Sequence, residues 1–274
     1  MPELKYRRII LKVSGEGLCG VGETGLNPES LDRLAREIKS VVDLGAQIGL
    51  VIGGGNLIRG DDLAGKVSIA PAAAHYMGML ATVINAIAIQ EILEPLGVDT
   101  RVQSAIAIDR VCEPFVRRRA IRHLEKGRVV LFAAGTGNPF VTTDTCAALR
   151  ASEIGADALL KATKVDGVYT ADPVKDRNAT RLPFLTYNEV IDGRLRVMDL
   201  SAVVMCQENH VPLVVFDLWQ SGHMSAIVRG EPLGTLVSET NDRLLKGERR
   251  KAKGEKGRVI QVQAPVGRNL DLED

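Results

Sequence analysis

Short runs of aliphatic residues alternate along the chain with longer stretches in which apolar residues recur at helical spacing. The aliphatic runs predict strands at Ile9–Val13, Ile48–Ile52, Val98–Val102, Val129–Ala133, Ala158–Lys161 and Leu213–Phe216. Helices are predicted between them, at about residues 28–44, 76–93, 114–125, 143–154, 201–209 and 224–228. Because the runs are continuous rather than alternating, they are typical of strands covered on both faces of a parallel sheet. The order of elements predicts an α/β fold, a three-layer α/β/α sandwich with a mainly parallel sheet.

The amino-acid composition excludes several classes of protein. The chain has 274 residues, of which 45% are hydrophobic and 25% charged, so it can bury a sizeable core and is not mostly disordered. Lys plus Arg number 35 and Asp plus Glu number 34, which gives a net charge of +1. No field of the whole protein therefore attracts nucleic acid or acidic membranes. An aromatic content of 4% argues against a base-stacking surface.

The spacing of the cysteines and the hydropathy of the chain indicate in which cellular compartment the protein works. The four cysteines are widely spaced and form no C-x-x-C motif, so we expect reduced thiols rather than a zinc site or a redox pair. The first eight residues lack an apolar signal region, and the uncharged stretch Tyr76–Gln90 is too short to span a bilayer. We therefore expect a cytoplasmic protein that does not associate with membranes.

The character of the chain changes near residue 238. Between Arg243 and Arg258 there are eight basic and two acidic residues, and apolar residues become sparse. We therefore divide the chain into a domain at 1–238 and a basic, polar, flexible C-terminal tail at 239–274. A solvated tail is the simpler interpretation, and binding of nucleic acid or another anion is the alternative.

Three glycine-rich turns follow predicted strands. They are the turns at residues 12–16, 53–56 and 135–139. In open α/β sheets, ligands bind beyond the carboxyl ends of the strands, and glycine lets backbone N–H groups approach phosphate oxygens closely. Lys12 and Arg59 lie beside two of the turns, and Thr142 and Thr143 open a helix whose N-terminus favours anions. The three turns together predict a polyphosphate site.

The standard nucleotide motifs do not account for this site. The segment at 60–67 nearly matches a P-loop, but Val67 replaces the hydroxyl that binds magnesium and no strand immediately precedes Gly60. The turn at 135–137 lacks the third glycine of the dinucleotide fingerprint, because residue 140 is Phe. A further polar cluster at 161–173 follows a predicted strand, and by itself it is also compatible with a β-hairpin.

Six blocks of the sequence resemble the bacterial uridylate kinases of the amino acid kinase family. They are ILKVSGE at 10–16, VIGGGNLIRG at 51–60, MGMLATVIN at 77–85, RRRAIRHLEKGR at 117–128, FAAGTGNPFVTTDT at 132–145 and LKATKVDGVYTADP at 160–173. The lysine–glycine and Asp-Gly-Val-Tyr elements are shared across amino acid kinases. The blocks at 77–85, 117–128 and 132–145 are the ones that favour uridylate kinases, and the similarity spans about residues 7–238.

The resemblance implies the amino acid kinase fold and transfer of the γ-phosphate of ATP to UMP, giving UDP and ADP in pyrimidine nucleotide biosynthesis. It implies Mg²⁺ with ATP, held mainly by phosphates rather than by metal ligands of the protein. It also implies a homohexamer in which the apolar helix at 77–90 commonly lies at the dimer contact. GTP activates some members of the family, and UTP inhibition is a further expectation.

The resemblance also assigns site residues by position. The catalytic residues are Lys12, Arg59 and Asp144. The ATP-binding residues are Lys12, Val13, Ser14, Gly15, Gly55, Arg59, Thr163, Tyr169 and Asp172. The UMP-binding residues are Gly54, His75, Thr136, Gly137, Asn138, Pro139, Phe140, Val141, Thr142 and Thr143. Arg101 and Arg128 match positions that bind GTP in some members.

His75 departs from the family pattern. The family usually has an Asp two residues ahead of Met77, which bonds the uridine ribose, whereas this chain has His. An acceptor for two hydroxyls is replaced by a ring with at most one acceptor nitrogen. We hypothesise weaker or pH-dependent UMP binding, unless Asp61 or Asp62 compensates. The alternative is that His75 merely starts a helix.

Two other functions fit parts of the sequence. A relative that phosphorylates a carboxylate, as glutamate and aspartate kinases do, would share Lys12, the glycine turns and the 160–173 block. It would not need the 135–143 segment in its present form. A nucleotide-sensing regulator or nucleic-acid-binding protein would use the basic tail instead.

Overall fold

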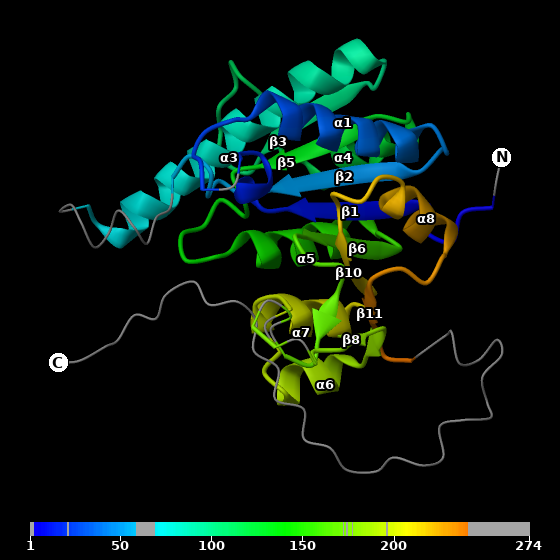
Figure 1. Cartoon of the computed structure of the whole chain (residues 1–274). Helices are drawn as coiled ribbons and strands as arrows, with labels where there is room; N and C mark the ends of the chain where they lie inside the picture. Colours follow the sequence, from blue (N-terminus) through cyan, green and yellow to red (C-terminus); the bar gives the residue numbers. More distant parts are fainter. Residues whose placement is uncertain are drawn as a thin grey trace.

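Nine strands of the described chain form the central sheet, with helices on both faces (Figure 1). The computed structural model describes residues 3–20, 22–58, 69–171, 173, 175–176, 178–195 and 197–240. The strands of this sheet are β1 (Arg8–Val13), β2 (Gln47–Ile52), β3 (Thr100–Ser104), β4 (Glu113–Pro114), β5 (Val129–Ala133), β6 (Ala158–Thr163), β9 (Phe184–Leu185), β10 (Leu213–Asp217) and β11 (Thr235–Val237). A separate small sheet pairs β7 (Val168–Tyr169) with β8 (Arg181–Leu182).

The order of strands across the sheet is β4-β3-β5-β2-β1-β6-β10-β11-β9. All pairs are parallel except β10 with β11. β1 lies in the middle, between β2 and β6, so its carboxyl end meets those of both neighbours at one edge. The predicted three-layer sandwich with a mainly parallel sheet is therefore confirmed.

The helices divide between the two faces of the sheet. They are α1 (Pro28–Val42), α3 (Pro71–Leu93), α4 (Arg117–Glu125), α5 (Thr143–Ile154), α6 (Tyr187–Asp192), α7 (Leu200–Glu208) and α8 (His223–Arg229), with short 3₁₀ turns η1 (Gly15–Gly17) and η2 (Glu94–Leu96). One core joins α1, α3 and α8 to the sheet, and the other joins α4, α5, α6 and α7 to its opposite face. The sheet has a core on each face because successive side chains of a strand point to opposite faces. On β1, Ile9 and Leu11 belong to the first core and Ile10 belongs to the second.

Most predicted elements lie where expected, and three boundaries need correction. The strand expected at Val98–Val102 is β3 at Thr100–Ser104, because its pairing with β5 begins at Thr100 and continues to Ser104. α3 begins at Pro71 instead of Tyr76, because Pro at the first helical position and the alanines after it favour helix. α4 begins at Arg117 instead of Pro114. Pro114 belongs to β4 at the edge of the sheet, where a missing N–H costs no central ladder bond. The cluster at 161–173 is not a tight hairpin, since β7 pairs with the more distant β8.

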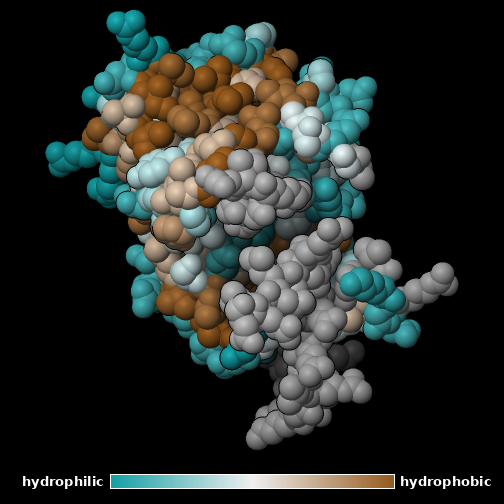
Figure 2. Space-filling view, turned by 90° about the vertical axis from the view of Figure 1, so that its left-hand side faces the viewer, coloured by the Kyte–Doolittle hydropathy of each residue, from teal (hydrophilic) through white to brown (hydrophobic). Residues whose placement is uncertain are grey.

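α3 has one buried face and one exposed apolar face. Its inner side chains, such as Met79, Val83 and Ile89, are buried against the sheet. Its outer side chains Tyr76, Leu80 and Ile84 are 45%, 47% and 51% exposed. Figure 2 views the molecule from the side on which α3 begins and shows a broad hydrophobic surface there. By length and composition alone this helix is apolar enough to cross a membrane, but its buried face identifies it as a core helix.

Candidate active site

The first two glycine-rich turns are in contact at the carboxyl edge of the sheet. The amide of Gly53 donates to the carbonyl of Val13 over 3.0 Å. A Cβ on Gly15 would lie 2.6 Å from Asn56 Oδ1 and 2.7 Å from the Gly55 nitrogen, so only glycine fits there. A Cβ on Gly53 would lie 3.6 Å from Thr143 Oγ1, which places the start of α5 beside both turns.

A buried pair of amides holds the second turn. Asn56 and Asn85 exchange side-chain hydrogen bonds of 3.0 and 2.7 Å, and Asn85 Nδ2 also donates to the Gly53 carbonyl over 2.8 Å. Asn56 Nδ2 donates in addition to the Gly25 carbonyl. This pair was not among the predicted site residues, although an asparagine within an otherwise apolar helix was a signal. The pair ties the turn to α3.

Lys12, Asp144 and Lys161 form a buried cluster next to the turns. Lys12 on β1 and Lys161 on β6 are register partners on neighbouring parallel strands. Asp144, in the first turn of α5, places one oxygen 2.7 Å from Lys12 Nζ and the other 2.9 Å from Lys161 Nζ. Like charges on adjacent strands repel each other, so the shared carboxylate is what allows the two ammonium groups to lie together.

Ionisation follows from this arrangement. Burial raises the pKa of Asp144, but the ammonium groups of Lys12 and Lys161 outweigh burial and hold that pKa below its usual range. Burial lowers the pKa of Lys161, and the attraction of Asp144 and Asp199 only partly compensates. Lys161 Nζ also donates to the Val197 carbonyl over 2.5 Å. Lys161 was not among the predicted site residues. A lysine within a buried aliphatic strand was the available signal.

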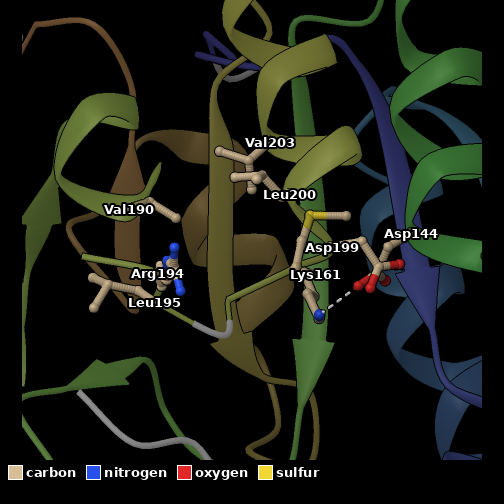
Figure 3. A pocket seen from close by; sticks show the side chains of 9 residues that line it. Asp144, Lys161, Val190, Arg194, Leu195, Asp199, Leu200 and Val203 are labelled. Atoms are coloured by element: carbon tan, nitrogen blue, oxygen red, sulfur yellow. Dashed lines mark hydrogen bonds and ion pairs between the residues drawn. The ribbon is translucent and has the colours of Figure 1, made fainter. Parts of the chain in front are cut away.

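A cavity of about 580 Å³ adjoins the cluster (Figure 3). Asp144, Lys161 and Asp199 line it together with Arg194 and apolar side chains of α6, α7 and the segment between them. Figure 3 shows Lys161 directed toward Asp144, while Arg194 lies on the other side of the cavity. The cavity therefore has a cation at each of two walls, the carboxylates of Asp144 and Asp199, and apolar side chains over the rest of its lining. Such a mixed lining can accept a ligand that carries both a ring and an anionic group with its counter-ion.

The third turn is built between α3 and α5. Thr82 Oγ1 accepts from the Ala134 amide over 2.7 Å, and the Gly137 amide donates to the Ala134 carbonyl over 2.9 Å. Thr142 caps α5 by accepting from the Thr145 amide. Between these anchors Phe140 adopts a left-handed conformation, with φ of 64°, and the residue is 68% exposed. The predicted UMP segment is thus an open loop at the same edge as Lys12.

His75 lies near the start of α3, and its ring contacts that of Phe140. The structure therefore places this unusual residue against the predicted UMP segment. Gly54 lies near the same helix, since a Cβ there would come within 2.6 Å of the Gly78 carbonyl oxygen. The predicted UMP residues from α3, the second turn and the third turn are close neighbours.

The predicted ATP residues at 163–169 shape their own loop. Thr163, at the end of β6, donates its hydroxyl to the Val165 carbonyl over 2.5 Å. Tyr169 donates to Asp166 over 2.5 Å, and this bond raises the pKa of the phenol. Ser14 follows β1 in extended conformation and leads into η1. Ser14 and Thr163 lie at the carboxyl ends of β1 and β6, which are neighbours in the central sheet, whereas Tyr169 lies in β7 of the small sheet.

Arg101 and Arg128 belong to a separate cluster. Arg101 Nε lies 4.0 Å from Glu113, and Glu113 also contacts His123 over 3.2 Å. Arg128 Nη1 lies 3.1 Å from His123 Nδ1. The two arginines are thus linked through one carboxylate and one imidazole.

Several predicted residues lie outside the described part of the chain. They are Arg59, Asp61, Asp62, Asp172 and residues 241–274 of the tail.

The sequence and the fold both match known proteins. The model of the amino acid kinase family matches residues 7–217. The chain is 61% identical over 236 residues to a uridylate kinase of Paramagnetospirillum magneticum, covering 86% of this chain and 98% of that protein. It is 52% identical over 239 residues to a chloroplastic uridylate kinase of Arabidopsis thaliana, covering 87% of this chain and 70% of that protein. A crystal structure of the UMP kinase of Bacillus anthracis superposes with a TM-score of 0.84 at 38% identity, covering 86% and 97%.

Proposed function

The chain belongs to the amino acid kinase family, as one of its uridylate kinases, and we propose that it transfers the γ-phosphate of ATP to UMP at the carboxyl edge of the sheet. One observation carries the proposal. The carboxylate of Asp144 is held between the ammonium groups of Lys12 and Lys161, beside the contact of two glycine-rich turns. Fixed cations at that place suit a reaction that brings two polyanions together.

The acceptor needs no catalytic base. The second pKa of a phosphate monoester is about 6, so the phosphate of UMP is largely a dianion at pH 7. Its oxygen attacks the γ-phosphorus of ATP, the bond to the β-phosphate oxygen breaks, and ADP leaves with that electron pair. The protein must align the two nucleotides and offset their repulsion.

Lys12 is the residue that touches the reacting phosphates. It extends from the middle strand at the meeting point of the turns, and the pair with Asp144 fixes its ammonium group. Asp144 is a positioning residue, because its two oxygens are directed at the two lysines. Lys161 adds a second positive charge next to the cavity, and Arg59 is the further cation that the resemblance implies.

Magnesium fits this site as an ion carried by ATP. Both oxygens of Asp144 face ammonium groups, so this carboxylate has little capacity for a metal. In the described part of the chain, no three His, Cys, Asp or Glu side chains gather to hold one. Asp199, the other carboxylate of the cavity, is the residue that would face the ion. When bound, magnesium neutralises charge on the phosphate oxygens.

The two nucleotides occupy opposite sides of Lys12. ATP binds along Val13, Ser14, Gly15 and Gly55 toward Thr163, Tyr169 and Asp172, and the adjoining cavity receives part of it. UMP binds against Gly54, His75 and the loop Thr136–Thr143. The convergence of the three turns supports this division.

The proposal extends to assembly and regulation. The exposed apolar face of α3 supports a homohexamer with this helix at a dimer contact. The linked cluster of Arg101 and Arg128 supports an anion site for GTP, and UTP is the expected inhibitor. The tail at 239–274 is separate from the catalytic domain at 1–238, and the enzyme works in the cytoplasm.

The test is release of ADP from ATP and magnesium, with UMP, CMP, glutamate and aspartate offered separately. We expect turnover with UMP and none with the two amino acids. Turnover with glutamate or aspartate would establish a carboxylate kinase instead. ATP binding without turnover of any acceptor would overturn the proposal and leave a nucleotide-sensing role.

A further inference from the structure

Arg150 is a buried charge for which the proposed phosphoryl transfer has no direct use. It lies on α5, six residues after Asp144, and is only 4% exposed. An arginine is costly to bury unless its N–H groups find partners, so its contacts show what holds it there.

The partners of Arg150 fix its guanidinium from three directions. Nη1 donates to Glu153 Oε2 over 2.6 Å, and Nη2 donates to the Gly135 carbonyl over 3.2 Å. The guanidinium carbon lies 3.7 Å from the centre of the Phe115 ring, a close cation–π contact. Among the described residues, Nε has no hydrogen-bond partner. The hydrogen bond to Glu153 is therefore part of an ion pair within α5. The hydrogen bond to Gly135 holds a backbone carbonyl that lies outside α5.

That carbonyl belongs to a turn that needs support. Ala134 and Gly135 are consecutive left-handed residues, with φ of 59° and 56°. Alanine resists this conformation, because its Cβ crowds the following carbonyl. Thr82 holds the turn from the side of α3, through the Ala134 amide. Arg150 holds it from the side of α5, through the Gly135 carbonyl.

We infer that Arg150 is a positioning residue for the acceptor nucleotide, which it serves by holding the turn at 134–137 in the shape that leads into the loop Thr136–Thr143. The inference rests on the proposed binding of UMP to that loop. Arg150 does not touch the nucleotide. Its charged donor keeps the left-handed turn formed before UMP arrives, so UMP binding does not have to order it.

The test compares KM values in the full-length enzyme. Arg150→Met removes the donor and keeps much of the buried volume. We expect the KM for UMP to rise about tenfold, the scale of one hydrogen bond from a charged donor, with the KM for ATP within about twofold. Arg8→Met is the matched control, because Arg8 donates to the Ile154 carbonyl at the other end of α5 and does not contact the turn. Neither KM should change in this variant.

A second substitution separates positioning from general stability. Adding Ala134→Gly to Arg150→Met should recover part of the lost UMP affinity, because glycine adopts the left-handed conformation without strain. If Arg150→Met does not fold, Phe115→Leu removes the ring contact with Arg150, together with an edge contact to Phe132, and leaves both hydrogen bonds of Arg150 in place. It should raise the UMP KM by a smaller factor and leave the ATP KM unchanged.

Three outcomes would overturn the inference while wild-type enzyme turns over UMP normally. They are an unchanged UMP KM in Arg150→Met or its substitute Phe115→Leu, an equal rise in both KM values, and no recovery by Ala134→Gly. A wild-type enzyme that does not use UMP would overturn the proposed function first, and the inference with it.

Discussion

The imidazole of His75 meets the ring of Phe140 edge to face, with ring centroids 4.6 Å apart and planes inclined at 62°. The contact joins the start of α3 to the exposed tip of the loop that we propose binds UMP. The histidine therefore packs on that loop as well as lying near the start of the helix. Where the family places a carboxylate for the ribose, this chain places a ring that packs on the loop.

Variants of His75 test how the replacement of Asp by His changes the affinity for UMP. His75→Asp restores an ionised acceptor, and a hydrogen bond to a charged group contributes about 1.5–3 kcal/mol. It also removes a ring pair, which contributes about 0.5–1.5 kcal/mol. The gain exceeds the loss, so we expect UMP to bind about tenfold more tightly, as calorimetry would measure. His75→Ala loses the ring without gaining an acceptor and should bind UMP more weakly. Unchanged affinity in His75→Asp would refute a ribose contact at this position.

Lys12 is the residue whose loss should slow the reaction most. Lys12→Ala should lower kcat by about 10²–10³, the effect of removing one preorganised donor to a transition state. Stopped assays at saturating ATP and UMP would measure it. Lys39→Ala is the control, because Lys39 pairs with Asp43 on the surface of α1 and should leave kcat unchanged. A loss of less than about fivefold in Lys12→Ala would contradict the proposed contact with the reacting phosphates.

Asp144→Asn should shift the alkaline limb of the pH–rate profile. Burial already lowers the pKa of Lys161, and Asp144 is the main group that opposes burial. An opposite charge at this range is worth about 1–3 pKa units, so the limb should move to lower pH by that amount. An alkaline limb that stays in place would show that Lys161 does not control the rate.

The same substitution changes stability at acid pH. The folded-state pKa of Asp144 is depressed, so its contribution is present above the unfolded value of about 4 and is lost as pH falls through the lower folded value. Thermal melts of Asp144→Asn should therefore lose that acid-dependent step. Melting curves that keep the same dependence on acid would assign the step to other carboxylates.

The central sheet could be predicted from local pattern, and the pairing of the short strands could not. Continuous aliphatic runs such as Val129–Ala133 identify strands covered on both faces, wherever the sheet places them. β9 and β11 have two and three residues, and only their tertiary neighbours make them strands. α6 was also missed. Its capping box at Thr186 and Glu189 was a readable signal, but the helix is only six residues long.

The parts of the site that could be predicted are those fixed by the ends of the strands or by the resemblance to the family. The glycine turns could be placed because parallel strands end at one edge, and their proximity follows from the order β5-β2-β1 of the strands that precede them. The pairing of Lys161 with Asp144 depends on register, since one residue of slip would turn the lysine to the other face. The roles of Arg150 and Asn85 depend on contacts between elements far apart in the sequence.

A charge on the outer face of α3 should disrupt the proposed hexamer. Leu80 is 47% exposed in the single chain and lies between Tyr76 and Ile84 on the apolar face. Burying a new carboxylate there without a partner is unfavourable, so Leu80→Glu should lower the particle mass measured by light scattering. Lys39→Glu places a charge change on the surface of α1 and should leave the mass unchanged. A wild-type chain that is already monomeric would remove the basis for the proposed hexamer.

Removing the tail separates its role from catalysis. The match to the Bacillus anthracis UMP kinase covers 97% of that enzyme but only 86% of this chain. Almost all of that enzyme is therefore matched without a segment equivalent to the tail. Deletion of residues 239–274 should therefore leave kcat and the KM for UMP within about twofold. If the eight basic residues at 243–258 bind nucleic acid, filter binding of the full chain should weaken steeply from 50 to 200 mM salt, as about one counterion is released per phosphate contacted. The deleted chain should then bind neither strongly nor with that salt dependence. A large loss of kinase activity on deletion would show that the tail belongs to the catalytic domain after all.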